Sequence, residues 1–477
     1  MSFTNMRHLA ADSGNEEAVR PQLRRRIQAV LALSAAATAC VPGLAGADSQ
    51  STADATYQVA NTNETLLDLD KRLGLRGWNI PFFSYANTLT QNNDGFRTDL
   101  AKHGIGVLAE DIFSYANNVL DTPRSNPAGQ QSYWGQKASG QSALNMFLVY
   151  DLGQYGIPDG QFQLGGNITN STLQSYAPNQ YALYRFAYYQ SAFNHLFEFS
   201  VGYMSNALTF VGVYVGGQLQ NPFGPSSTIP IELGLSGSVA VAPTAWLKTN
   251  ITSHFYNQFG AQRSISPKSG AVTQDHFANS SMLRFEEKGT RALYIDEIGY
   301  KRAASAGQPY TWLRAGGIYN TTRYHNYETK GTSNNDGFYA LADRQVLQFS
   351  SETPRRGLYL GASAMWGKPQ TNLYSQYYEA RLYGFGLIKS RPKDMTSVVF
   401  QRNIISHYFS DPINDTSDTT GTFAQNYANT ITGSYAYQLA PGLSFTAGLQ
   451  YTDHPSATYF KGEGSALNVL AALFVAI

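Results

Sequence analysis

A repeated hairpin pattern constrains the fold of this chain more than any other feature, and residues 379–402 show it most clearly. Two segments with period-two alternation flank a short turn that is rich in Gly, Pro and basic residues. In the first segment Leu382, Gly384, Gly386 and Ile388 alternate with Arg381, Tyr383, Phe385 and Lys389. Because successive side chains of a strand point to opposite faces, this pattern predicts an antiparallel hairpin. Similar hairpins recur along most of the chain, and a membrane-spanning barrel explains so long a series.

The N-terminal region has the features of a targeting signal. Arginines at 24–26 precede an apolar run at 27–44 that closes with the small residues 45–47. This arrangement is typical of a secretory signal peptide, so residues 1–47 are predicted to be removed; a membrane anchor is the alternative, disfavoured by the Pro-Gly pair inside the run. The only cysteine, Cys40, lies in this segment, which leaves the mature chain without thiol or disulfide chemistry.

The composition is that of a barrel rather than of a helical membrane protein or a soluble domain. Charged residues make up 14% of the chain, against roughly 25% in ordinary soluble domains. Tyr (32), Phe (26) and Gly (43) are abundant, which suits aromatic girdles and tight turns. The mean hydropathy is −0.30, and no stretch after residue 47 approaches the ~20 apolar residues of a spanning helix. The net charge of +1 gives no sign of a nucleic-acid partner.

The predicted fold class is all-β, a transmembrane antiparallel β-barrel of about 16 strands with a short N-terminal periplasmic helix. The segment 64–77 has leucines at helical spacing and lies in a predicted periplasmic segment, 48–94. From residue 95 the period changes to two, so the barrel is predicted to span 95–477. Candidate strands lie at 104–111, 144–151, 161–169, 182–190, 195–203, 231–241, 245–255, 280–287, 292–300, 310–319, 341–349, 357–366, 379–389, 396–403, 430–439, 443–452 and 467–477. An even strand number is required, so at least one of these segments is expected not to be a strand.

The strand faces follow from the same alternation. In the segment 443–452 the apolar residues are expected to face the lipid and the Ser, Thr, Gly and Gln residues the lumen; the segment 233–241 is interpreted in the same way. Trp246 and Trp366 stand at strand ends and are assigned to the interface girdle. Segments rich in Asn, Ser, Gly, Thr and Pro are predicted to be extracellular loops, some of which fold inward. They lie at 115–141, 214–230, 256–279, 320–340 and 404–428.

Several of these runs together resemble the carbohydrate-selective porin family, OprB type. The runs are LYRFAYYQSAFNHLFEFSVGYM (183–204), NPFGPSSTIPIELGLSGSVAVAP (221–243), YIDEIGYKRAASAGQPYTWLRAGGIYNTTRY (294–324), GFGLIKSRPKDMTSVVFQR (384–402) and LAPGLSFTAGLQYTDHP (439–455). The resemblance implies a 16-stranded barrel in the bacterial outer membrane that lets sugars such as glucose diffuse passively into the periplasm.

A sugar-selective waist needs groups that hydrogen-bond hydroxyls and flat aromatic faces that stack on the ring, and charged groups form the stronger hydrogen bonds. Strand parity selects the inward-facing candidates for this role. They are Arg97, Arg185, Glu198, Glu297, Trp312, Arg314, Glu379 and Arg381. Asp296 and Glu297 are adjacent, so only one of them is expected to face the lumen. The alternative for each charge is that it solvates the lumen or pairs with a neighbour.

Three functions other than a selective porin stay open from the sequence: a general diffusion pore, a plugged barrel that acts as an adhesin, and an outer-membrane hydrolase. The hydrolase is disfavoured because the chain has no G-x-S-x-G and no H-E-x-x-H motif. The expected partners are monosaccharides or small oligosaccharides and outer-membrane lipid, with a homotrimer as one open oligomeric state. No catalytic residue, metal ligand or cofactor is expected.

Overall fold

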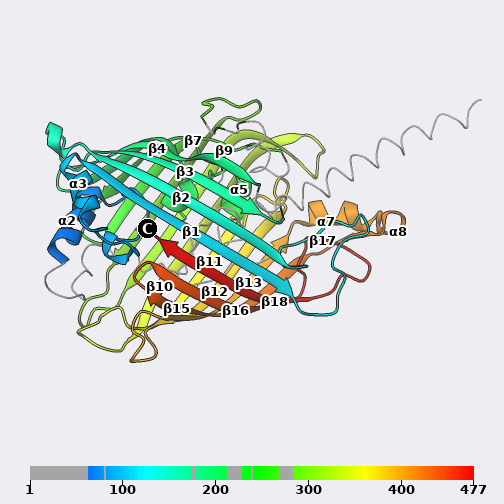
Figure 1. Ribbon diagram of the computed structural model, residues 1–477. Coiled ribbons are helices and arrows are strands. Elements are labelled where there is room, and N and C mark those ends of the chain that lie inside the picture. The colour runs from blue at the N-terminus through cyan, green and yellow to red at the C-terminus, as the bar shows by residue number, and fades with distance from the viewer. Residues whose placement is uncertain are drawn as a thin grey trace, which may run out of the picture.

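The computed structural model describes residues 63–79, 82–173, 178–211, 228–237, 240–268, 275, 279, 281 and 283–477. In this part of the chain sixteen antiparallel strands form one closed barrel, with β1 paired to β18. Figure 1 shows these two strands side by side and inclined to the barrel axis. The predicted barrel of about 16 strands is confirmed. The predicted signal peptide at 1–47 and most of the predicted loop at 214–230 lie outside the described residues.

The elements follow one another along the chain with few departures from a simple meander. The barrel strands are β1 (Ile105–Asn118), β2 (Ser139–Asp151), β3 (Gln161–Ser171), β4 (Gln180–Ala192), β5 (Phe197–Met204), β6 (Ala242–Asn250), β7 (Phe255–Arg263), β8 (Ala292–Arg302), β9 (Thr311–His325), β10 (Thr332–Gln348), β11 (Gly357–Gly367), β12 (Tyr374–Phe385), β13 (Met395–Ile405), β15 (Tyr427–Ala440), β16 (Leu443–Thr452) and β18 (Ala466–Ala476). The short strands β14 (Thr422–Ala424) and β17 (Thr458–Phe460) pair in a separate sheet. The helices are α2 (Asn63–Leu73), η1 (Tyr85–Asn87), α3 (Phe96–Lys102), η2 (Gly153–Tyr155), α4 (Asn206–Thr209), α5 (Thr228–Glu232), α7 (His407–Asn414) and α8 (Ser417–Thr420).

Two predicted strands are wrong and one strand was not predicted. The described residues of 231–241 and 280–287 contain no barrel strand. The missed strand is β7, which lies mostly inside the predicted loop at 256–279. The alternation of polar and apolar residues is not apparent in the sequence of β7, because Asn257 and Gln258 are both polar although they lie on opposite faces of the strand.

The two ends of the barrel differ in their connections. At the short-turn end the strands are joined by brief connections such as 251–254 and 441–442, whereas connections such as 119–138 and 406–426 form the long-loop end. The helices α2 and α3 and the C-terminus lie at the short-turn end (Figure 1). Short turns on one side and long loops on the other are the usual asymmetry of outer-membrane barrels. Among the described helices, none has both the length and the apolarity to cross a bilayer.

The described residues of the connection between β5 and β6 fold into the barrel instead of covering its end. Phe210, Leu233 and Leu235 are buried in one apolar cluster with the strand residues Ile295 and Tyr339. This explains why 231–241 looked like a strand, since its apolar residues pack against the inner wall and not against lipid. Burial raises the pKa of Glu232, on α5 in this connection, to about 8.

Of the two tryptophans that were predicted to lie in the interface girdle, one lies inside the barrel and the other on its outer face. Trp246 is not in a girdle: it is buried in the same interior cluster, and its indole N–H points at Met204 Sδ, 3.2 Å away. Trp366 is half-buried, and its ring stacks on exposed Phe338 with the ring centroids 4.6 Å apart. This second position suits an aromatic girdle.

Candidate channel waist

The N-terminal segment narrows the short-turn end of the barrel from inside. Leu69 and Leu73 of α2 are buried against Leu108 and Ile112, which are inward-facing residues of β1. Inward Gly106 makes room for this contact, because a Cβ there would lie 2.6 Å from the Tyr85 hydroxyl oxygen and 2.8 Å from the Leu73 Cβ. The predicted short helix therefore packs inside the mouth of the barrel.

Side-chain amides and one lysine hold the residues that follow α2 in the chain against the inner wall of the barrel. Gln161 donates to the Gly74 carbonyl oxygen (3.0 Å) and Gln163 to that of Arg76 (3.2 Å). Further along the segment, the Asn79 carbonyl oxygen accepts a hydrogen bond from Lys301 Nζ at 2.8 Å. These contacts reach from β3 to β8, so the N-terminal segment crosses the lumen between the two sides of the barrel.

Arg97 lies apart from the other predicted site residues. It belongs to α3 and is buried, with its guanidinium above the Tyr85 ring at 5.0 Å. Its Nη1 donates to Thr88 Oγ1 at 2.7 Å and also to the Gln91 carbonyl oxygen. These partners all belong to the N-terminal segment, so Arg97 holds that segment together and does not line the strand wall.

Arg185 and Glu198 face inward on β4 and β5, and both have protein partners. Arg185 is 1% exposed and donates to Gln163 Oε1 (2.5 Å). Glu198 accepts from the Tyr189 hydroxyl (2.9 Å) and lies 3.8 Å from Lys248 Nζ. Lys248 is directly opposite Glu198 in the strand register, so parity would have identified it.

Glu297 occupies a pocket of neutral donors on β8. It is fully buried and accepts from the Tyr256 hydroxyl (2.8 Å), the Tyr339 hydroxyl (2.7 Å) and the Asn79 amide (3.1 Å). Its neighbour Asp296 points outward, as expected from parity, and accepts from Asn257. Asn79 could not be predicted, since it lies in an irregular segment without periodicity.

Trp312 and Arg314 face inward on β9, and Trp312 offers no free face for a sugar ring. The Arg314 guanidinium lies 3.5 Å from the Trp312 ring centroid, and Lys301 Nζ lies 4.3 Å from it. The indole N–H donates to the Tyr256 hydroxyl at 3.2 Å. Trp312 therefore positions both cations through cation–π contacts. Arg314 and Lys301, and not the indole ring, form the polar surface of the wall at this point.

Glu379 and Arg381 form a closed ionic cluster on β12 with Asp343 of β10. Arg381 Nη2 lies 3.1 Å from both Asp343 oxygens, and its Nη1 contacts Glu379 and donates to Ser363 Oγ at 2.7 Å. Glu379 also accepts from Gln401 (2.9 Å). The side chains of Arg381, Glu379 and Asp343 are at most 4% exposed. Asp343 was missed although its parity points inward.

An opposite part of the wall is polar but uncharged. In the ring of strands, β16 and β18 lie across from β7 and β8. Their inward side chains include Ser444, Thr446 and Asn468, which are buried and have hydrogen-bonding atoms without a partner among the described residues. The wall thus offers ionic groups on one side and hydroxyl and amide groups on the other.

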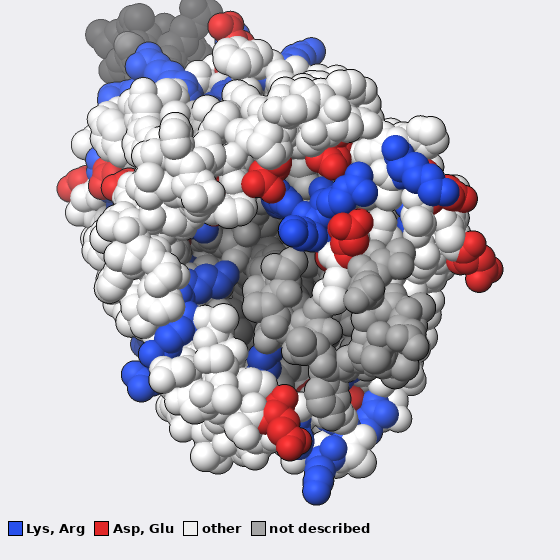
Figure 2. Space-filling view, turned by 90° about the vertical axis from the view of Figure 1, so that its left-hand side faces the viewer, with Lys and Arg blue, Asp and Glu red and all other residues white. Residues whose placement is uncertain are grey.

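Charged side chains also border the short-turn mouth of the barrel. Figure 2 looks onto this end and shows a hollowed face, with Lys and Arg side chains gathered on one edge of the hollow beside Asp and Glu side chains. Lys301 and Trp312, which pair across β8 and β9, lie next to the connection at 303–310 on this end. A solute that passes through the barrel meets these cations near the short-turn mouth.

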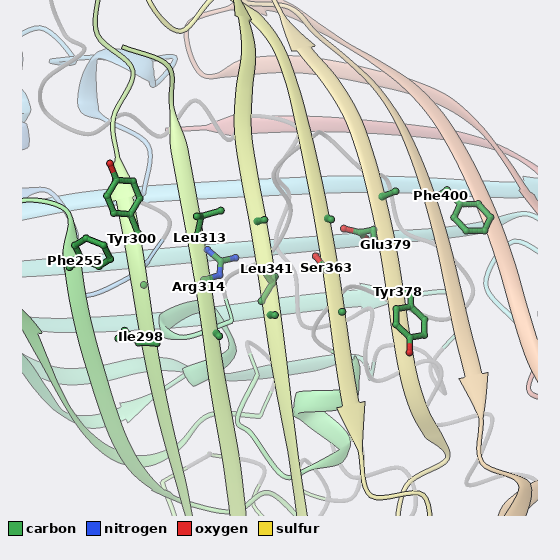
Figure 3. A pocket seen from close by; sticks show the side chains of 17 residues that line it. Phe255, Ile298, Tyr300, Leu313, Arg314, Leu341, Ser363, Tyr378, Glu379 and Phe400 are labelled. Atoms are coloured by element: carbon green, nitrogen blue, oxygen red, sulfur yellow. The ribbon is translucent and has the colours of Figure 1, made fainter.

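A separate groove of about 870 Å³ lies on the outer surface, away from this wall. Outward-facing alanines of neighbouring strands form much of its floor: Ala315, Ala340, Ala342, Ala362, Ala364 and Ala380. Figure 3 shows the aromatic side chains of Phe255, Tyr300, Tyr378 and Phe400 around it. Arg314 and Glu379 also border the groove, although strand parity turns both side chains inward. Its lining is mainly apolar, so this groove is not a site for sugars.

Comparisons with known proteins agree with this architecture. The family described as "Carbohydrate-selective porin, OprB family" matches residues 54–470. The high-pH structure of Pseudomonas putida OprB is similar with a TM-score of 0.69 at 16% identity, covering 85% of this chain and 99% of that one. The low-pH structure of the same protein gives a TM-score of 0.52 at 17% identity, covering 83% and 100%. No curated protein matches the sequence. At 16% and 17% identity the two structures support the fold alone. The family match covers most of the sequence and therefore establishes the family. The chain belongs to the carbohydrate-selective porin family, OprB type, and is an outer-membrane barrel for passive diffusion of sugars.

Proposed function

We propose that the channel admits neutral monosaccharides such as glucose, and small oligosaccharides, through a waist lined by the inward groups of β8–β12 and β16–β18. The observation that carries this proposal is the polar inner wall near the short-turn end, which is ionic around Arg314 of β9 and has hydroxyl groups without a described partner at Ser444 and Thr446 of β16. A solute with many hydroxyls can hydrogen-bond to both kinds of group, whereas a solute without hydroxyls cannot. A passive channel must also release what it binds, and neutral hydroxyls bind weakly enough for that.

The test is single-channel recording in planar bilayers. Addition of glucose is expected to reduce the current in a concentration-dependent way, and a short polyethylene glycol of similar size is expected to reduce it less. Equal effects of both solutes would support the alternative of a general diffusion pore. A folded protein without conductance would favour the plugged barrel.

We further propose the maturation and the boundaries of the chain. Removal of residues 1–47 on export leaves a periplasmic segment, 48–94, and a barrel at 95–477. The support is the charged and apolar pattern before residue 47 and the docking of α2 inside the short-turn mouth. N-terminal sequencing of the outer-membrane protein tests the cleavage site. We also propose that the chain has no enzymatic activity, in line with the absence of the two hydrolase motifs from its sequence.

A homotrimer stays a prediction. The alanine-lined outer groove supports it, because small side chains let another sheet approach closely and the aromatic side chains around it extend the contact area. Sedimentation in detergent measures the mass directly. A monomeric mass at all protein concentrations would contradict the trimer and leave the groove to lipid.

A further inference from the structure

Arg314 is a buried cation for which the described residues supply no hydrogen-bond partner. Only 6% of the residue is exposed, and neither its Nε nor its Nη1 has a partner among the residues that the structure describes. The other predicted arginines have protein acceptors: Arg185 donates to Gln163, and Arg381 donates to Asp343 although its Nε has no partner among the described residues. Burying guanidinium donors without a partner is unfavourable, so such a group needs an explanation. The simplest explanation is an acceptor that is supplied from outside the protein.

The described residues around Arg314 do not supply that acceptor. Glu297 interacts with it electrostatically, but the hydrogen bonds of this carboxylate come from two tyrosines and Asn79. Asp343, another nearby acid, is bound to Arg381. The acids of this wall are therefore committed to other groups.

Further cations surround the same point. Lys301 shares the Trp312 ring with Arg314, and both Lys248 and Arg355 interact with Lys301 electrostatically. Lys248 has a partner in Glu198 at 3.8 Å, but neither Lys301 nor Arg314 forms an ion pair within the described residues. Cations thus outnumber uncommitted acids at the short-turn mouth, and their mutual repulsion would decrease if an anion bound there.

We infer that Arg314, with Lys301 beside it, forms a subsite for the carboxylate of an acidic sugar, a uronate or an aldonate. The inference rests on the proposed passage of sugars and deepens it by naming a charged substrate class. A guanidinium with free donors binds a carboxylate through charge-assisted hydrogen bonds, which are stronger than the bonds it forms with a neutral hydroxyl. The hydroxyl groups at the short-turn end of β16, Ser444 and Thr446, receive the sugar hydroxyls.

D-Glucose and D-glucuronate form a matched pair of probes, since they share the ring and differ only at C6. In planar bilayers, glucuronate is expected to block the current at a concentration at least about tenfold lower than glucose. Acetate is the control for a carboxylate without a sugar and is expected to block weakly. Acetate as effective as glucuronate would overturn the inference, because the site would then bind any small anion.

The Arg314→Gln variant should reduce the glucuronate block to the level of glucose. Arg344→Gln is the matched control, since Arg344 is an exposed, outward-facing arginine of β10, and its block should equal that of the wild type. Equal block by the two sugars in the wild type would overturn the inference and leave the proposed function intact. A channel insensitive to both sugars would overturn both proposals.

A second measurement needs no variant, so it holds even if Arg314→Gln does not fold. The reversal potential of the wild-type channel in a KCl gradient reports whether the mouth favours anions. Selectivity for chloride over potassium is the expected result, and preference for potassium would contradict a cationic subsite.

Discussion

The ionic cluster on β10 and β12 gives a sharp test of how the lumen wall is stabilised. Replacing Arg381 by Met keeps most of the side-chain volume but leaves Asp343 and Glu379 buried without their common cation. Both carboxylates are at most 5% exposed, and each is within hydrogen-bonding distance of the guanidinium. Removing one partner of a buried ion pair costs about 3–5 kcal/mol. We expect Arg381→Met to lower the free energy of unfolding by this amount.

Urea unfolding in lipid vesicles, followed by tryptophan fluorescence, measures the change. The triple variant Asp343→Asn, Glu379→Gln, Arg381→Met removes all three charges and should recover most of the loss, because replacing a whole buried ion cluster by neutral groups is often nearly neutral. Arg344→Met, on the outer surface, is the control and should change the stability little. If the single and triple variants unfold alike, or if the single variant loses less than about 1 kcal/mol, the carboxylates are not effectively buried and the reasoning fails.

Two further predictions concern the N-terminal segment in the mouth of the barrel. Gly106→Ala should weaken the docking of this segment by about 1–3 kcal/mol, because the added methyl group overpacks against Tyr85 and Leu73. The expected signs are faster proteolysis of α2 and higher conductance. Gly140→Ala is the control and should have no effect, because the nearest atom to a Cβ there is 3.9 Å away. Burial raises the pKa of Asp70 on α2 from 3.8 to about 7, so docking should be strongest at low pH and weaken as the pH rises towards 7. Proteolysis of the segment at pH 5 and pH 8 measures this, and a difference that persists in Asp70→Asn would show that another group titrates.

The outer face of the barrel was predictable because lipid imposes a strict alternation on it. In β16 the residues Phe445, Leu449 and Tyr451 face outward as expected, and Gln450 faces inward. The same rule failed where apolar side chains pack inside the barrel. Leu235 and its neighbours alternate like a strand, but their apolar environment is the interior cluster. Apolar burial in lipid and burial in a folded-in loop leave the same sequence pattern.

The lumen wall was only partly predictable for a different reason. Strand parity identifies which side chains point inward, and it correctly predicted that Glu297 faces the lumen and Asp296 the outside. It does not say which of the inward groups are saturated by neighbours. That depends on contacts between distant segments, such as Asn79 with Glu297. Lys301 could have been chosen by parity, but its role depends on sharing the ring of Trp312.

Saturation of hydrogen bonds determines how strongly a passive channel can hold its solute. Arg381 has most of its donors committed to Asp343, Glu379 and Ser363, so it contributes rigidity and little affinity. Arg314 has two guanidinium nitrogens, Nε and Nη1, without a partner among the described residues, whereas Arg381 has only its Nε in that state. One unsaturated guanidinium binds a carboxylate or a hydroxyl in a single place, and a second one next to it would form a clamp that releases slowly. The closed cluster on β12 therefore preserves fast release, because it withdraws a second arginine from the solute.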